Sequence, residues 1–233
     1  DFSGYSDIAI GTSRLFGFNL MKNFAFPYFS RDIAEFWRRW HISLSTWFRD
    51  YLYIPLGGSK RGKWKSLRNI FIIFLVSGFW HGANWTFIFW GLFHSILFIP
   101  SYLFRTNRKY VTSIIAENRL IPTLKEIFQV ISTFFLVTIG WVFFRSETIG
   151  DSFIYISKLY SFEEFFSHEN PYNYMKSYKY FIIILMFLVC EYFQTKNLKL
   201  NRFSSLVLFV LLLLVILIFM PIGLSDNFIY FQF

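Results

Sequence analysis

Long apolar runs dominate the chain from residue 70 onwards. Nearly uninterrupted apolar sequence extends from Ile70 to Phe104, and further runs cover Ile127 to Phe144, Tyr178 to Phe193 and Leu206 to Ile222. An α-helix rises about 1.5 Å per residue and the hydrocarbon core of a bilayer is about 30 Å thick, so each of the three later runs suits one span. The pattern predicts an all-α, polytopic transmembrane helical bundle.

The first run is too long for a single helix, which would measure about 50 Å. It must therefore break, tilt strongly or turn back, and Gly78 and Gly82, which flank His81, are the expected place. The alternation of loop charge fits two arms that form a pair of passes. Irregular backbone at membrane depth is tolerated only where protein buries it or where it lines a cavity. An ionisable residue there usually marks a substrate or proton path, so His81 is the first candidate for function.

A different pattern precedes these runs, between Ser30 and Leu52. Its charged residues lie opposite a helical apolar stripe, which favours one amphipathic helix that Ser30 caps and that ends before Pro55. Such a helix is too charged to span, so we expect it to lie in the interface or to pack on other helices. His41 falls at the edge of the stripe, from which it can point into the protein. The stripe consists of Ile33, Phe36, Trp37, Trp40, Leu44, Trp47, Phe48 and Tyr51.

Composition and charge fit this interpretation. The chain is 55% hydrophobic and 16% charged, whereas soluble domains have about 25% charged residues. A net charge of +9 would suit nucleic acid, but the basic residues lie in loops beside apolar runs, where the positive-inside rule and anionic lipids explain them better. We therefore expect a lipid bilayer and no nucleic acid as partner.

Loop charge also predicts orientation. The basic loops 59–68, 105–125 and 194–203 should be cytoplasmic, which leaves the acidic loop 145–177 and the segment 226–233 outside. Without a repeat or linker, residues 1–233 should form a single membrane domain. The chain starts without Met or a signal peptide, so we expect it to be the C-terminal part of a longer protein.

Several ordered motifs resemble the membrane-bound O-acyltransferase family, and most closely its alginate O-acetylation branch. They cover most of the chain and correspond to the C-terminal half of that fold. The motifs are DFSGYSD at 1–7, FWRRWHISLS at 36–45, YLYIPLGG at 51–58, WHGANW at 80–85 and the terminal residues 228–233.

The resemblance implies a multi-helix membrane bundle whose central tunnel brings an acyl thioester from the cytoplasm to an acceptor. It identifies His81 as the catalytic residue and His41 as its partner. It further implies acetyl-CoA as donor substrate with no bound cofactor, a polysaccharide such as alginate or another exopolysaccharide as acceptor, an extracytoplasmic acetyltransferase as partner, and the bacterial inner (cytoplasmic) membrane as location.

Histidine suits this chemistry because acyl transfer to a hydroxyl requires a base, and an imidazole with a pKa near 6.5 is largely neutral at pH 7. The alternative for His81 is a buried ring bonded to a backbone carbonyl, and for His41 a structural hydrogen bond or a headgroup contact. For His94 and Glu191 we expect interior polar contacts.

Other candidates for binding substrate or donor are weaker. Asn84, Ser77 and Thr86 offer orienting groups or oxyanion donors. Arg38 and Arg39 suit donor phosphates, although anchoring in the interface explains them as well. Trp80 and Trp85 are as well explained by packing, and Asp7 by helix capping. We expect no metal site, because no two histidines have ligand spacing, and Cys190 is isolated.

Two other functions stay open. In a transporter or lipid-handling protein, His81 would gate a path or relay protons. In a relative that acts on D-alanyl or protein acceptors, the chemistry would be similar and the substrates different.

Overall fold

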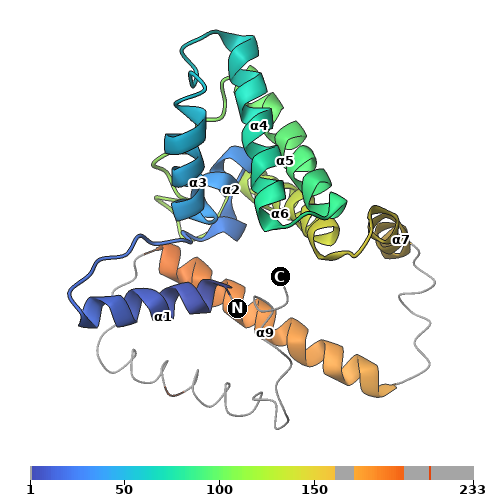
Figure 1. Cartoon of the computed structure of the whole chain (residues 1–233). Coiled ribbons are helices and arrows are strands. Elements are labelled where there is room, and N and C mark those ends of the chain that lie inside the picture. The colour runs from blue at the N-terminus through green and yellow to red at the C-terminus, as the bar shows by residue number, and fades with distance from the viewer. Residues whose placement is uncertain (1, 161–170, 197–209, 211–233) are drawn as a thin grey trace.

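The chain folds into helices in the computed structural model, which describes residues 2–160, 171–196 and 210. Every regular element in these residues is helical (Figure 1). The elements are α1 (Phe2–Leu15), the 3-10 turn η1 (Pro27–Phe29), α2 (Ile33–Arg39), α3 (Ile42–Phe48), the π turn η2 (Arg49–Tyr53), α4 (Lys63–His81), α5 (Trp85–Leu103), α6 (Leu124–Arg145), α7 (Ile149–Tyr160) and α9 (Pro171–Thr195).

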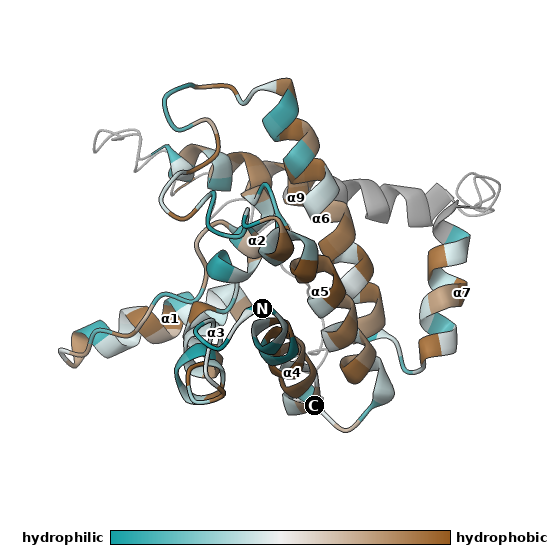
Figure 2. Cartoon of the chain, turned by 90° about the horizontal axis from the view of Figure 1, so that it is seen from above, coloured by the Kyte–Doolittle hydropathy of each residue, from teal (hydrophilic) through white to brown (hydrophobic). Residues whose placement is uncertain are grey.

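Among the described residues, α5 and α6 are long and apolar enough to cross a membrane, and apolar residues predominate along both (Figure 2). They coincide with the second arm of the first predicted run and with the run from Ile127 to Phe144. The run from Tyr178 to Phe193 lies within α9. The run from Leu206 to Ile222 lies outside the described residues, apart from position 210.

Helices α4 and α5 form the predicted hairpin, and its turn is at Gly82, whose φ of 151° suits glycine. Gly78, however, does not break the helix. A Cβ atom there would lie 2.2 Å from the Phe87 carbonyl oxygen, and one on Gly91 would lie 2.2 Å from that of Phe74. The two glycines therefore allow close backbone packing, as small residues do between membrane helices.

The prediction of one helix from Ser30 to Leu52 is wrong. Asp32, not Ser30, caps α2 by accepting a hydrogen bond from the Glu35 amide at 2.7 Å. The helix then stops at Trp40, and α3 starts after His41, which has a left-handed backbone (φ 44°). Helical structure ends at Tyr53, before Pro55 as predicted.

The segment before α2 explains this break. The Ala25 amide donates to the Arg39 carbonyl at 3.0 Å, and the Ile42 amide donates to the Asn23 carbonyl at 2.9 Å. The Asn23 side chain also accepts from the Ser43 hydroxyl at 2.5 Å. These contacts satisfy backbone groups that a continuous helix would have paired, so the chain can turn at His41.

Candidate active site

A cavity of about 960 Å³ lies between α3 and the α4–α5 hairpin, with α6 contributing to its wall. On α4 its lining residues recur with helical spacing at Lys63, Ile70, Phe74, Ser77 and His81, so they share one face of that helix. At 1.5 Å per residue this face is about 27 Å long. The cavity therefore follows α4 over its whole length.

His81 and His41 both line this cavity. His81 is the last residue of α4, and its ring makes edge contacts with Phe144 at 4.8 Å and with Trp90 at 5.4 Å between centroids. Trp80 contacts both imidazoles, at 4.9 Å from His81 and 6.3 Å from His41. The structure thus brings the two predicted histidines to one aromatic end of the cavity.

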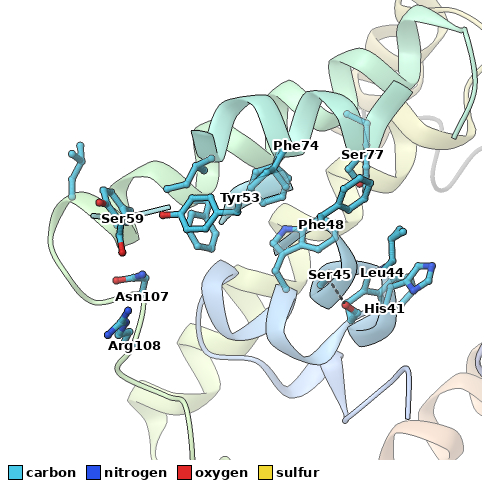
Figure 3. Close-up of a pocket in the computed structure, with 18 of the residues that line it drawn as sticks. His41, Leu44, Ser45, Phe48, Tyr53, Ser59, Phe74, Ser77, Asn107 and Arg108 are labelled. Atoms are coloured by element: carbon cyan, nitrogen blue, oxygen red, sulfur yellow. Dashed lines mark hydrogen bonds between the residues drawn. The ribbon is translucent and has the colours of Figure 1, made fainter. Parts of the chain in front are cut away.

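The left-handed turn positions His41 at the start of α3. Leu44, Ser45 and Phe48 follow on the same face and also line the cavity (Figure 3). Nδ1 of His41 is buried and has no hydrogen-bond partner among the described residues. Burial lowers the pKa of His41 from 6.5 to about 4, because desolvation disfavours the charged ring. His41 is therefore neutral at pH 7.

The other end of the cavity is polar and basic. It is lined by residues from the ends of η2, α4 and α5 and from the loops beside them, and Figure 3 shows Asn107, Arg108 and Ser59 at the end away from His41 and Ser77. Two tyrosines, Tyr53 and Tyr102, also line this part of the cavity. The members of this basic mouth are Tyr53, Ser59, Lys63, Tyr102, Arg105, Asn107 and Arg108.

The weaker candidates divide between the cavity and other places. Ser77 is buried and lines the cavity. Asn84 instead caps α5, accepting from the Thr86 amide at 3.1 Å and donating to the Glu147 carbonyl at 2.9 Å. Trp85 is 74% exposed. Asn84 and Trp85 are not among the residues that line the cavity, so the structure does not bring them to the histidines.

Arg38, Arg39 and Asp7 also lie outside the cavity lining. Arg38 donates to the carbonyls of Asn107 and Tyr110, and Arg39 donates to the Glu35 carboxylate at 2.8 Å. Asp7 is exposed on α1. Direct binding of the donor by these residues stays a prediction, and the hydrogen bonds of both arginines are with other parts of the protein.

Sequence reasoning missed the basic mouth. Loop charge predicts only that Lys63, Arg105 and Arg108 are cytoplasmic, whereas the antiparallel hairpin brings its two basic ends together. A chain that turns back was one of the outcomes that the sequence allowed for this run, and in that case its two basic ends had to converge.

His94 was expected to make an interior polar contact. It is fully buried, but neither ring nitrogen has a hydrogen-bond partner among the described residues. Its neighbours are aromatic: the rings of Trp37 and Trp90 each lie 5.0 Å away. Gly140 packs against it, and a Cβ atom on that glycine would lie 2.7 Å from Nε2. His94 therefore helps to build the wall behind the cavity.

Comparison with known proteins gives a consistent family. A model of the membrane-bound O-acyltransferase family matches residues 1–143. The chain is 46% identical over 162 residues to the probable alginate O-acetylase AlgI of Pseudomonas aeruginosa, a match covering 70% of this chain and 29% of that protein. It is 43% identical over 149 residues to the peptidoglycan O-acetyltransferase of Helicobacter pylori, covering 64% of this chain and 27% of that protein.

A third relative is named for the transfer of a D-alanyl group instead of an acetyl group. The teichoic acid D-alanyltransferase of Bacillus subtilis is 35% identical over 155 residues, which cover 63% of this chain and 38% of that protein. The matches therefore span well under half the length of all three relatives.

Proposed function

The chain belongs to the membrane-bound O-acyltransferase family, and on that premise we propose that it is an O-acetyltransferase passing acetyl groups from cytoplasmic acetyl-CoA towards an extracytoplasmic polysaccharide. One observation carries the proposal: a single cavity has two histidines at its aromatic end and a basic mouth at the other. An anionic thioester bound at the mouth would extend towards the imidazoles. The resemblance seen in the sequence is confirmed at the level of the family.

The family and the two apolar helices make the chain a membrane protein. We further propose that it is a multi-pass protein of the inner membrane, forming the C-terminal part of a polytopic bundle. Because α4 and α5 are antiparallel, Lys63 and Arg105 lie at the same end of the hairpin, and the positive-inside rule puts that end in the cytoplasm. The basic mouth then opens to the cytoplasm, which contains the proposed donor acetyl-CoA.

The donor would be held by charge at the mouth and by shape within the cavity. Guanidinium groups pair with phosphate oxygens through parallel hydrogen bonds, which suits Arg105 and Arg108 to the phosphates of CoA, and Lys63 adds a third cation. The aromatic walls would exclude water from the thioester, which suppresses its hydrolysis. Acetyl-CoA is thus a substrate, and no resident cofactor is needed for the step.

In the proposed reaction, His81 removes the proton from the acceptor hydroxyl as its oxygen attacks the thioester carbonyl. The tetrahedral intermediate then collapses, the C–S bond breaks, and the CoA thiolate takes up the proton from His81. A positioned base of this kind is typically worth about 10² to 10⁴ in rate. His41, which is neutral at pH 7, would orient the acceptor or His81 without adding a repelling charge.

The acceptor would be a cell-surface polymer, as in the names of the relatives from Pseudomonas aeruginosa and Helicobacter pylori. A separate extracytoplasmic acetyltransferase would receive the acetyl group and pass it on. The relative named for D-alanyl transfer favours one alternative, in which the donor is a carrier-bound D-alanyl thioester.

The test is acetyl transfer by the full-length protein in membranes supplied with radiolabelled acetyl-CoA. We expect His81→Ala to abolish polymer acetylation at normal membrane expression, and His41→Ala to reduce it by about 10²-fold or more. Wild-type acetylation in the His81 variant would overturn the catalytic assignment. Transport of an unmodified substrate without donor turnover would favour a transporter, and turnover of D-alanyl carrier alone would favour the alternative donor.

A further inference from the structure

The loop from residue 104 to 123, which joins α5 to α6, supplies a large part of the basic mouth. Arg105, Asn107 and Arg108 all line the cavity from this loop. The loop leaves α5 through a left-handed residue, Arg105 (φ 56°), and the amides of Thr106 and Asn107 both donate to the Ser101 carbonyl. The position of these cavity-lining residues therefore depends on what holds the loop backbone.

Helix α2 provides that support through Arg38. Its Nη1 atom donates to the Asn107 carbonyl at 2.5 Å, and its Nη2 atom donates to the Tyr110 carbonyl at 3.3 Å. The fork of one planar guanidinium thus spans the part of the loop that includes Arg108. Carbonyl groups of a loop need such partners because they do not take part in the hydrogen bonds of a helix or a sheet.

Two other arginines of the same region hold the far part of the loop. Arg31 donates to the Ser113 carbonyl at 2.8 Å and to the Ile114 carbonyl at 3.3 Å, and its guanidinium carbon lies 3.9 Å from the Tyr110 ring centroid. Arg39 donates to the same Ser113 carbonyl at 3.1 Å. Both pair with the buried Glu35 carboxylate. Arg38 differs because it bonds the segment that faces the cavity.

We propose that Arg38 is a positioning residue, which fixes Arg105, Asn107 and Arg108 at the mouth and so sets the affinity for the anionic donor without touching it. The inference rests on the proposed function. Under this inference, the adjacent arginines of the FWRRW segment, Arg38 and Arg39, shape the donor site and do not bind its phosphates. Arg38 does not line this cavity but a smaller hollow behind it, which it shares with Asn107 and Arg108. Both of its terminal nitrogens have carbonyl partners.

A double-mutant cycle on the full-length protein in membranes tests the proposal, with acetyl-CoA as the varied substrate. Arg38→Gln should raise KM for acetyl-CoA by about tenfold and leave kcat within about twofold. In an Arg105→Gln, Arg108→Gln background the same change should raise KM by less than about twofold, since residues acting through one another are not additive. A full tenfold effect in that background would mean that Arg38 acts independently, and would overturn the proposal.

Hydrogen exchange supplies a readout that does not depend on turnover. In Arg38→Gln the amides of residues 107–113 should exchange faster than in the wild type, while those of α4 and α5 are unchanged. Unchanged exchange in the loop would contradict the inference. If exchange rises throughout the protein, Arg38→Lys decides instead: Lys keeps the charge but lacks the fork, so KM should rise by about threefold, and an unaltered KM overturns the proposal.

Two controls separate this inference from the function on which it rests. Arg49→Gln removes an exposed arginine that pairs with its neighbour Asp50 outside the cavity lining, and it should leave KM unchanged. Wild-type turnover of acetyl-CoA is measured first. Its absence overturns the proposed function, whereas turnover with an unaltered KM in the Arg38 variants overturns only the positioning role.

Discussion

At the scale of single residues, the site combines two imidazoles with different kinds of support. His81 contacts the rings of Trp80, Trp90 and Phe144, whereas His41 owes its position to a left-handed turn. The sequence predicted His81 from its place between two apolar arms, whereas His41 became a candidate through the family motif that contains it. It did not predict the turn, because the contacts of Asn23 and Ala25 that permit it are tertiary.

The lowered pKa of His41 predicts how stability depends on pH. Folding depresses this pKa from 6.5 to about 4, so between these values the unfolded chain binds more protons than the folded one. The contribution of His41 to stability is therefore complete above about pH 6.5 and is lost as the pH falls towards 4. We expect His41→Gln, which cannot titrate, to lose less stability than the wild type over this window.

Unfolding midpoints of the detergent-solubilised protein, measured from pH 7 to pH 4, check this expectation. The relevant quantity is the difference between wild type and variant, because the groups that do not interact with His41 cancel in it. Parallel pH profiles would show that His41 is not shielded from protonation.

At the scale of elements, the α4–α5 hairpin was predictable in outline and not in detail. Its total length called for a break, a strong tilt or a turn near Gly78 and Gly82, and the observed turn at Gly82 is one of these outcomes. The role of Gly78 did not follow, because a glycine inside an apolar run reads equally well as a turn or as a packing position. Only the carbonyl of Phe87 facing it decides between them.

That packing makes Gly78→Ala and Gly91→Ala strongly destabilising. In each case the new methyl group would lie 2.2 Å from a backbone carbonyl oxygen, so the helices must separate, and overpacking of this kind costs about 1 to 3 kcal/mol. Thermal unfolding in detergent measures the loss. Gly11→Ala in α1 is the matched control, since nothing lies within 4 Å of its added Cβ atom and alanine favours a helix. Equal effects at all three positions would refute the close approach.

At the scale of the whole molecule, loop charge and helix order jointly specify an orientation. The basic ends of α4 and α5 and the start of α6 should be cytoplasmic, and the segment joining α6 to α7 should be external. The sequence gives the sign of each loop, but the convergence of Lys63, Arg105 and Arg108 on one mouth required the folded hairpin.

Cysteine labelling in intact cells tests this orientation. With Cys190→Ser as background, Glu147→Cys should react with a membrane-impermeant maleimide, whereas Lys65→Cys should react only after the cells are opened. Both side chains are exposed, so burial does not confound the comparison. The reverse pattern would invert the topology and place the basic mouth outside.

The tight contact at Gly78 and Gly91 has a mechanical consequence for the cavity. In α4 and α5, backbone carbonyl groups of one helix pack directly against glycines of the other. We therefore expect the two helices to move together as one rigid wall of the cavity. The facing wall is a seven-residue helix followed by a π turn, and such short pieces yield more readily. If the cavity widens to admit a bulky ligand, we therefore expect α3 to move and the backbone to bend at His41.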